Sequence, residues 1–398
     1  MTNPPQFEEV RYRELFLPDD AFADGQGLPS FLKEKADRAC ELGPWSVTEK
    51  RFPSPSGDAR DYFSLSRYYH PNPDTADGLP YVARDGVPNP ELDQYDLGRL
   101  ARLVHTVQLL SIAYGFSKEA RYAERAALLL WVWFVDTETR MNPHMNFAQY
   151  IPGDERVQGP PGYPPRRVEG AEGKSVFVSY GGCIEGASLP LLLDALRVFE
   201  AAPEFTDTLW QGLRSWFGDF LDWLLESPLG LDEKNTRNNH ALWYRVQVCA
   251  YALFTGKPAL VRRIVAEELP MLLDAQMAED GSLPEECWRA IPFTYICFAM
   301  FALMNLVKLG ERAGVDGLWS RVTPGGRSVR LGAQWLANDL IRNPLRDGGL
   351  ESLRRQEDLA RMFLAAAIRF DEDSLFRRAG EQLPPWPPED ERGLVFGA

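Results

Sequence analysis

The sequence predicts an all-α fold in which helical hairpins form an α/α toroid, with long loops that build a cleft at one end. From Asp96 onward, apolar residues recur at helical spacing in one segment after another, and no strand-type alternation competes with this pattern. Two of these segments, which end at Trp131–Phe134 and Phe220–Trp223, each lead into a loop that contains asparagine and histidine. If the helices alternate in direction, both loops emerge at the same end, as in a toroid of hairpins.

We expect one domain over residues 1–398, because this length and a hydrophobic content of 45% suffice for one large core. Residues 1–95 are rich in Pro, Gly, Asp and Tyr and lack sustained periodicity, which predicts an irregular segment with lid-like loops. The helical hairpins then occupy 96–380, and 381–398 form a packed or solvated tail.

Segments with the amphipathic spacing of helices follow one another from Asp96. The first two, 96–114 and 118–135, are separated by the short turn Gly115–Lys118 and are therefore expected to form a helical hairpin. Loops are expected at 136–152 and 152–182. Further helices are expected at 184–201, 206–226, 258–275, 295–309, 329–338 and 356–366.

The formal net charge of -14 disfavours nucleic acid and anionic membranes as partners. No apolar stretch is long enough to cross a bilayer, and residues 1–25 contain no export signal. The expected location is therefore cytoplasmic, or secreted or periplasmic if a leader has been removed. The sequence leaves the oligomeric state open.

The five cysteines are scattered and form no Cys-x-x-Cys pair, which argues against a disulfide framework and a structural zinc site. Cys249 and Cys297 lie within apolar helical runs and are expected to be core thiols. The four histidines form no cluster and no His-Glu-x-x-His motif, so neither a metal nor another cofactor is predicted.

A polar stretch, Asn235–Gln247, runs directly into an apolar helix that ends near Gly256–Pro258. Asn238 or Asn239 is expected to cap this helix, and the helix dipole favours an anion near Asn239 and His240. On its own, the same stretch fits a capped helix with a surface histidine. A second polar stretch, Asp280–Tyr295, also runs into an apolar helix, and the two loops could face each other.

An ordered set of motifs resembles the signature of the alginate lyase family of polysaccharide lyases: Asn238–Gln247, Gln276, Asp280–Ser282, Glu285, Arg289 and Tyr295. Upstream motifs resemble the N-terminal half of the same family: Ser56–Tyr62, Gly78–Tyr81, Asp85–Gly86, Asn89–Pro90 and Thr139–Gln149. The resemblance implies an incomplete α/α toroid and cleavage of a 1,4-linked polyuronate, with alginate as the first expectation and glucuronan as the alternative. The partner would be an anionic polysaccharide, bound in a local positive cleft.

The implied reaction is β-elimination, in which the C5 proton beside the uronate carboxylate is removed and the C4 oxygen leaves. Hydrogen-bond donors must neutralise the carboxylate, while a base and an acid move the protons. By resemblance, Tyr295 is the acid and, for groups on the same side of the ring, also the base. His240 is the base for groups on opposite sides, Asn239 and Arg289 neutralise the carboxylate, and Arg289 lowers the pKa of Tyr295.

Further residues are expected to contact the substrate: Trp243, Tyr244, Gln149, His144, Asn146, Arg237, Tyr62 and Tyr68. Each also has a structural interpretation. Trp243 could belong to the core, His144, Asn146 and Gln149 could stabilise their loop, and the N-terminal tyrosines could pack the loops onto the body. Two other functional classes also stay open: a polyuronate hydrolase, with a carboxylate pair drawn from Glu185, Glu285 and Glu286, and a non-catalytic carbohydrate-binding protein.

Overall fold

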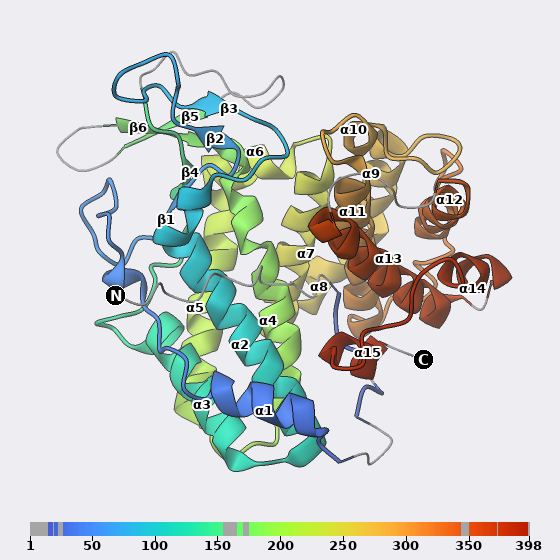
Figure 1. Ribbon diagram of the computed structural model, residues 1–398, viewed down its shortest axis with the longest axis horizontal. Helices are drawn as coiled ribbons and strands as arrows, with labels where there is room; N and C mark the ends of the chain where they lie inside the picture. Colours follow the sequence, from blue (N-terminus) through green and yellow to red (C-terminus); the bar gives the residue numbers. More distant parts are fainter. Residues whose placement is uncertain are drawn as a thin grey trace. The chain divides into compact units, whose positions relative to one another are not determined.

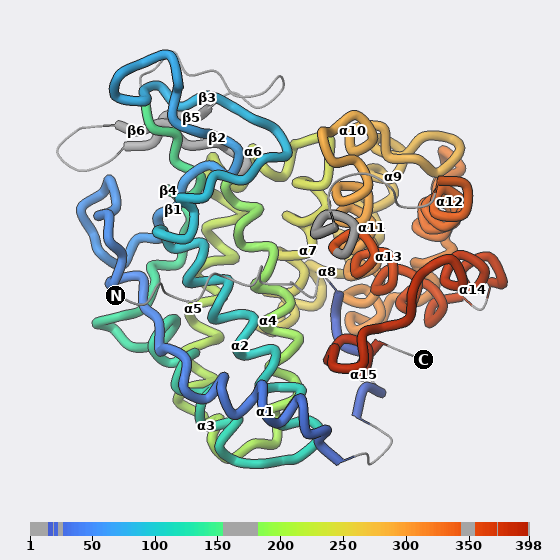
Figure 2. Tube along the Cα trace, viewed as in Figure 1, coloured from blue at the N-terminus to red at the C-terminus, as the bar shows by residue number. Residues whose placement is uncertain are grey.

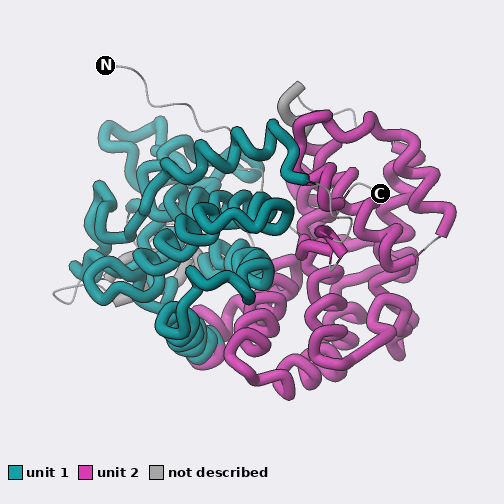
Figure 3. Tube along the Cα trace, turned by 90° about the horizontal axis from the view of Figure 1, so that it is seen from below, with its two compact units in different colours: residues 1–13, 25–224 teal, residues 14–24, 225–398 magenta. Residues whose placement is uncertain are grey.

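Helices dominate the computed structural model, which describes residues 15–18, 20–22, 27–153, 165–169, 175–343, 350–371 and 373–396, without the side chains of 165–169, 175–181 and 350–354 (Figures 1 and 2). The chain divides into two compact units, coloured separately in Figure 3. Unit 1 covers Gly25–Leu224, and unit 2 covers Leu225–Ala398 together with the N-terminal segment Glu14–Asp24. The single domain over 1–398 stays a prediction.

Unit 1 is organised around α2, which packs against α1, α3 and α4. Its helices are α1 (Ser30–Ala39), α2 (Asp96–Ser117), α3 (Ala120–Leu130), α4 (Leu189–Leu196) and α5 (Asp207–Glu226), with the short 3-10 turns η1 (Val47–Glu49), η2 (Pro90–Gln94), η5 (Tyr180–Ser188) and η6 (Arg197–Phe199) and the π-helical turn η3 (Trp131–Val135). The predicted hairpin of α2 and α3 is present. Helix α2 continues to Ser117, through most of the turn expected at 115–118. It ends at Lys118, which adopts the left-handed conformation (φ 57°).

Unit 1 also contains a small sheet in segments that were expected to be loops. Its strands are β1 (Phe63–Leu65), β4 (Phe147–Tyr150), β5 (Pro165–Glu169) and β6 (Ser175–Ser179), in the order β1-β4-β6-β5, beside a separate pair β2 (Tyr69–His70) and β3 (Val82–Ala83). β1 runs parallel to β4, and β6 is antiparallel to both of its neighbours. These strands have two to five residues, and the side chains of β1 are all buried, so they lack the alternation that would have revealed them.

Unit 2 is centred on α7, which packs against α6, α8 and α11. Its helices are α6 (Pro228–Lys234), α7 (Asn239–Phe254), α8 (Pro258–Arg263), the π-helical turn η7 (Ile264–Glu268), α9 (Leu269–Gln276), α10 (Pro284–Cys287), α11 (Pro292–Arg312), α12 (Val329–Arg342), α13 (Leu350–Phe370), α14 (Ser374–Gly380) and α15 (Glu391–Phe396). Helix α11 is long and apolar enough to cross a membrane, but 72% of its most apolar stretch is buried within the protein. Its composition is therefore that of a core helix.

Helix α11 begins at Pro292, three residues before the expected start at Tyr295. Proline is favoured in the first turn because its missing N–H would have no partner there. Tyr295 consequently lies within the first turn of the helix. Cys249 and Cys297 are fully buried on α7 and α11, as expected for core thiols.

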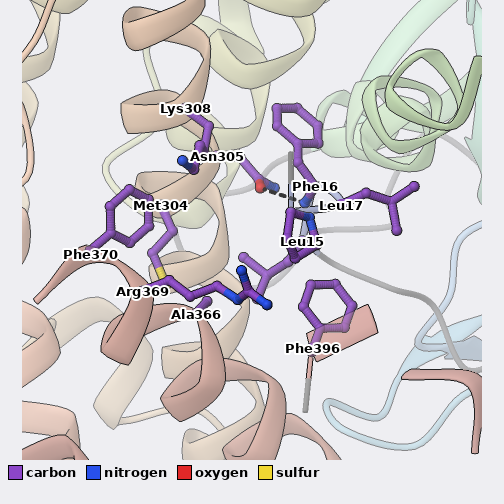
Figure 4. Close-up of a pocket in the computed structure, with 11 residues that line it drawn as sticks. Leu15, Phe16, Leu17, Met304, Asn305, Lys308, Ala366, Arg369, Phe370 and Phe396 are labelled. Carbon is purple, nitrogen blue, oxygen red and sulfur yellow. Dashed lines mark hydrogen bonds between the residues drawn. The ribbon is translucent and has the colours of Figure 1, made fainter. Parts of the chain in front are cut away.

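The N-terminal segment of unit 2 packs against α11, α13 and α15 around a small cavity of about 40 Å³ (Figure 4). Leu15, Phe16 and Leu17 are buried here, and the Phe16 N–H donates to Asn305 Oδ1 on α11 at 3.2 Å. This apolar anchoring makes Leu15–Leu17 part of the core of unit 2, within residues 1–95 that were expected to be an irregular segment with lid-like loops.

Candidate active site

Asn238 closes the N-terminus of α7, as one of the two expected caps. Its side-chain oxygen accepts the His240 N–H at 3.3 Å, and its backbone is extended (φ -135°, ψ -163°). This is the geometry of an N-cap residue, which satisfies a backbone donor that the first turn leaves without a helical partner. Asn239 and His240 therefore occupy the first two positions of a rigid helix.

The anion that the helix N-terminus was expected to attract is supplied by the chain itself. Glu286, from α10, accepts hydrogen bonds from the Asn239 N–H at 2.7 Å and from Asn239 Nδ2 at 2.8 Å. Burial raises the pKa of Glu286, and the Asn239 bonds and the nearby charges of His240 and Arg289 oppose this rise. The carboxylate holds the Asn239 amide in place and leaves the second hydrogen of Nδ2 to bind another acceptor.

His240 also pairs with a buried carboxylate. Its Nδ1 lies 2.9 Å from Oε1 of Glu233, in the last turn of α6. The Glu233 side chain is fully buried, whereas 17% of the His240 side chain is accessible. The imidazole is thus held from its buried side and reaches solvent with part of its ring.

Arg289 and Tyr295 form the third pair of the site. Arg289 Nη2 donates to the Tyr295 hydroxyl oxygen at 2.8 Å, and the guanidinium carbon lies 3.8 Å from the centre of the phenol ring. A cation in this position stabilises the charge of a phenolate. Both residues are partly exposed, which keeps the hydroxyl available for proton transfer.

Unit 2 therefore holds all four residues that were predicted to be catalytic. Asn239 and His240 lie on α7, Tyr295 lies on α11 against which α7 packs, and Arg289 lies between α10 and α11. Glu286 connects them, because it binds Asn239 directly and its carboxylate senses the charges of His240 and Arg289. Their roles in catalysis stay predictions.

Two of the residues expected to contact substrate from α7 are buried. Trp243 is 1% exposed, stacks on Phe298 with ring centres 4.8 Å apart and donates its Nε1–H to the Phe298 carbonyl. Tyr244 is 2% exposed. Both are buried because the apolar α7 is buried on nearly every side and not on one stripe, which agrees with the structural interpretation of Trp243. Their contact with substrate stays a prediction. Arg237, in the loop before α7, is exposed.

An exposed tryptophan stands beside the site instead. Trp288 is 59% exposed, directly precedes Arg289 and donates its Nε1–H to Glu285 at 3.1 Å. An aromatic face held in solvent by a hydrogen bond at its edge is suited to stacking on a sugar ring.

Two expected substrate contacts, His144 and Asn146, lie in the same loop of unit 1. His144 Nε2 is 3.0 Å from Asp61 Oδ1, and Asn146 Oδ1 accepts the Trp223 Nε1–H at 3.1 Å. Although burial raises it, hydrogen bonds from His144, Asn142 and Ser56 lower the pKa of Asp61 to about 2. The loop is thus tied to Asp61 and to Trp223 of α5, which agrees with the structural interpretation of His144 and Asn146.

Gln149 has a positive φ of 55°, which is uncommon for a residue other than glycine. Its N–H donates to Ser64 Oγ at 2.8 Å, and Ser64 in turn donates to Glu185 at 2.6 Å. Strain of this kind persists only where neighbouring contacts impose it, and it is frequent at binding sites. Gln149 therefore stays a candidate for substrate binding.

Tyr62 was expected to face a sugar, but it is fully buried and donates its hydroxyl to Glu185 at 2.7 Å. Burial raises the pKa of Glu185 to about 7, against the hydrogen bonds of Ser64 and Tyr62 and the charge of Arg67. Tyr62 therefore packs the N-terminal segment onto the body, as in the structural interpretation. Tyr68 is partly exposed and keeps its proposed role.

The two carboxylates that hold the site, Glu233 and Glu286, were missed as functional residues from the sequence. Glu286 was considered only as half of a hydrolase pair, and Glu233 not at all. Glu233 precedes His240 by seven positions and belongs to another helix, so no periodicity connects them. Among the described residues, no group of three or more His, Cys, Asp and Glu is arranged to hold a metal ion.

The chain is similar to proteins of known activity. A family model described as alginate lyase matches residues 46–345. An alginate lyase from Bacteroides ovatus is 29% identical, with a TM-score of 0.84 over 96% of this chain and 98% of that one. Alginate lyase A1-III from Sphingomonas species A1 is 15% identical, with a TM-score of 0.52 over 89% and 86% of the two chains. No curated protein matches the sequence.

These comparisons confirm the predicted fold class, because the matching structures are α/α toroids. They also confirm the resemblance that the motifs indicated. A tetrasaccharide complex of a variant of A1-III is among the matches, at 14% identity and a TM-score of 0.52 over 91% and 92% of the chains.

Proposed function

Because this chain belongs to the alginate lyase family of polysaccharide lyases, we propose that it cleaves alginate by β-elimination at the cluster of Asn239, His240, Arg289 and Tyr295. The observation that carries the assignment to these residues is the pairing of Tyr295 with Arg289 at 2.8 Å, in the unit that also holds Asn239 and His240. This arrangement supplies an acid, a base and carboxylate donors within one rigid helical unit.

Elimination requires the C5 proton to become acidic beside a carboxylate that is already negative. Charge flows onto that carboxylate as the C5–H bond breaks, so donors that bind it stabilise the transition state. The electron pair of the C5–H bond then forms the C4=C5 double bond, and the C4–O bond breaks. The leaving oxygen takes a proton, and the new chain end is unsaturated.

We assign carboxylate neutralisation to Asn239 and Arg289. The Asn239 amide is oriented by Glu286, which uses one of the two hydrogens of Nδ2. Arg289 bears a permanent positive charge in a planar group that suits carboxylate geometry. Tyr295 supplies the proton to the leaving oxygen, and as a phenolate beside Arg289 it also takes the C5 proton when both groups lie on one side of the ring. His240 takes this proton from the opposite side.

Substrate contacts beside the cluster are assigned to the accessible residues of unit 2, Arg237 and Trp288, which offer a positive charge and a ring face. Within unit 1, the predicted contacts Tyr68, His144, Asn146 and Gln149 are each partly exposed, and their roles stay predictions. A positive charge at Arg237 would offset the repulsion between the substrate and a chain with a net charge of -14.

The burial and the hydrogen bonds of Glu185 and Glu286 disfavour a hydrolase. Hydrolysis needs two acids on either side of the scissile bond. Glu185 is 8% exposed and bound by Tyr62 and Ser64, and Glu286 is 2% exposed and bound twice by Asn239. Glu285 is exposed and accepts the Trp288 Nε1–H, but neither Glu185 nor Glu286 offers an accessible carboxylate to complete a pair with it.

The test is the ultraviolet absorbance of the unsaturated product, followed with polymannuronate, polyguluronate and glucuronan as separate substrates. We expect a rise with an alginate block that is lost in Tyr295→Phe, which removes only the hydroxyl. A rise in absorbance with glucuronan alone would change the assigned substrate to glucuronan and leave the elimination mechanism in place. New reducing ends without any absorbance would overturn elimination and indicate hydrolysis.

A further inference from the structure

Glu233 is buried without an evident structural reason. Its side chain is fully buried, and of its two oxygens only Oε1 has a hydrogen-bond partner among the described residues, which is His240 Nδ1. A buried carboxylate with an unsatisfied oxygen lowers the free energy of unfolding. The helix dipole adds to this cost, because Glu233 lies in the last turn of α6, where the negative end disfavours an acid.

The position of Glu233 is nevertheless closely defined. Helix α6 starts with a serine cap, in which Ser227 Oγ accepts the Gly230 N–H at 3.0 Å, and it packs against α7. Its last turn is tied to α7 by Arg245, which donates to the Lys234 carbonyl at 3.0 Å and to the Ala241 carbonyl at 2.9 Å. The chain thus builds a rigid support for a group that does not stabilise the fold.

We propose that Glu233 is a positioning residue that fixes His240 as the Nδ1–H tautomer, so that Nε2 is the nitrogen that exchanges protons with the substrate. The role of Nε2 in proton exchange rests on the proposed function, whereas the tautomer follows from the contact with Glu233 alone. An ionised carboxylate accepts hydrogen bonds and cannot donate them, so the nitrogen that faces it must carry the hydrogen. Neutral His240 then presents Nε2 as a base, and protonated His240 presents it as a donor to the uronate carboxylate.

Glu233→Gln separates positioning from stability. Glutamine has the same shape, but its amide can accept from Nδ1–H or donate to a bare Nδ1, so the tautomer is no longer imposed. Since the substitution removes a buried charge, the melting temperature should stay the same or rise. A purely structural role would instead lower the melting temperature and leave the chemistry of His240 unchanged.

The direct readout is the nitrogen NMR spectrum of the histidine rings, which distinguishes the two tautomers. The chain has only four histidines, and the His240 signals are those lost in His240→Gln. We expect the Nδ1–H form in the unsubstituted protein and a mixture of both tautomers in Glu233→Gln. An Nε2–H form in the unsubstituted protein would overturn the proposal, whatever the enzyme cleaves.

The second readout is the pH profile of kcat/KM. Glu286 from α10 senses the charges of His240 and Arg289, Lys234 and Arg245 lie on the two helices that carry the pair, and Glu233→Gln leaves all of these charges in place. Loss of the negative charge that contacts the imidazole should therefore change the acidic limb of the profile, whereas a purely structural role of Glu233 would leave it in place. The value of kcat should fall about tenfold or more, because a general base contributes about 10²- to 10⁴-fold.

Asp358→Asn is the matched control. Asp358 is a buried acid of unit 2 that is paired with Arg361 and Arg392, neither of which belongs to the proposed catalytic cluster. Its substitution should lower the melting temperature and leave both the His240 tautomer and the pH limb unchanged. If Glu233→Gln behaves like this control, the proposal fails. If the tautomer is as proposed but no polyuronate is cleaved, the proposed function fails and the role of Glu233 in fixing the tautomer stands.

Discussion

The guanidinium of Arg289 is both stacked on the ring of Tyr295 and hydrogen-bonded to its hydroxyl, with Nη2 at 2.8 Å from the oxygen. A planar cation can make both contacts at once, whereas the ammonium of lysine is a point charge that cannot. The pair therefore depends on the shape of arginine as well as on its charge.

Arg289→Lys should lower kcat by about 10²-fold, close to the effect of removing one donor from a preorganised site. Arg289→Ala should lower it further, because the positive charge beside the phenolate is lost as well. The measurement is the initial rate of product absorbance at saturating alginate. Arg263→Lys, an exposed arginine paired with Glu268, provides the control and should keep full activity. Equal rates for Arg289→Lys and the unsubstituted enzyme would remove Arg289 from the mechanism.

The four residues predicted to be catalytic could be singled out from the sequence because they fall into two short ordered motifs that resemble the family, and their roles stay predictions. Asn238–His240 opens one helix and Arg289–Tyr295 leads into another, and the polar-to-apolar change marks both helix starts. The supporting acids could not be predicted, because contacts such as Asn239 with Glu286 join residues 47 positions apart. Only the packing of the helices brings them together.

The small sheet was missed, and the accessibility of the two tryptophans could not be predicted, for a related reason. Strand β1 pairs with β4, more than 80 residues later, and neither shows alternation. Trp243 and Trp288 have the same ring, and only the tertiary structure shows that Trp243 is buried under Phe298 and Trp288 is exposed. Residue type predicted the chemistry, but accessibility depended on contacts that are distant in the sequence.

Substitutions that place a carboxylate at position 239 and an amide at position 286 should separate the effect of this pair on stability from its effect on catalysis. Asn239→Asp places two carboxylates at hydrogen-bond distance, where both cannot be ionised. We expect a loss of about 1–3 kcal/mol in the free energy of unfolding at neutral pH. The loss should shrink as the pH falls, because one of the two acids then takes up a proton that they share.

The double variant Asn239→Asp with Glu286→Gln provides the test of this explanation. The glutamine oxygen can accept the backbone N–H of residue 239 and its amide can donate to the new carboxylate. Stability, measured by urea unfolding, should return, but lyase activity should stay lost because an acid at 239 repels the uronate. Recovery of activity together with stability would mean that Asn239 is structural only.

The two tryptophans should respond differently to truncation. Trp288→Ala should raise KM for alginate, by about 10-fold for one lost stacking contact, and leave the melting temperature unchanged. Trp243→Ala should cost about 3–5 kcal/mol in the free energy of unfolding, because it empties a packed site in the core. The measurements are KM for alginate and thermal unfolding, each on both variants. An unchanged KM in Trp288→Ala would remove this residue from the substrate contacts.

Glu185 should make unit 1 less stable as the pH rises. Burial raises the pKa of this group from 4.5 to about 7, so between these values the folded chain holds a proton that the unfolded chain has released. The free energy of unfolding therefore falls with rising pH across this interval. Glu185→Gln cannot ionise and keeps an acceptor for Tyr62 and Ser64, so it should gain stability relative to the unsubstituted protein, by at most about 3 kcal/mol at the upper end.

Tyr62→Phe is the matched control for this effect, because it removes the hydroxyl bound to Glu185 and leaves the titrating acid in place. A hydrogen bond to an ionised acceptor is worth more than one to a neutral acceptor, so Tyr62→Phe should cost more above the raised pKa than below it. Urea unfolding at about pH 5 and about pH 8 should thus show shifts of opposite sign for the two variants. If the stability difference between Glu185→Gln and the unsubstituted protein is the same at both pH values, Glu185 does not titrate in this range.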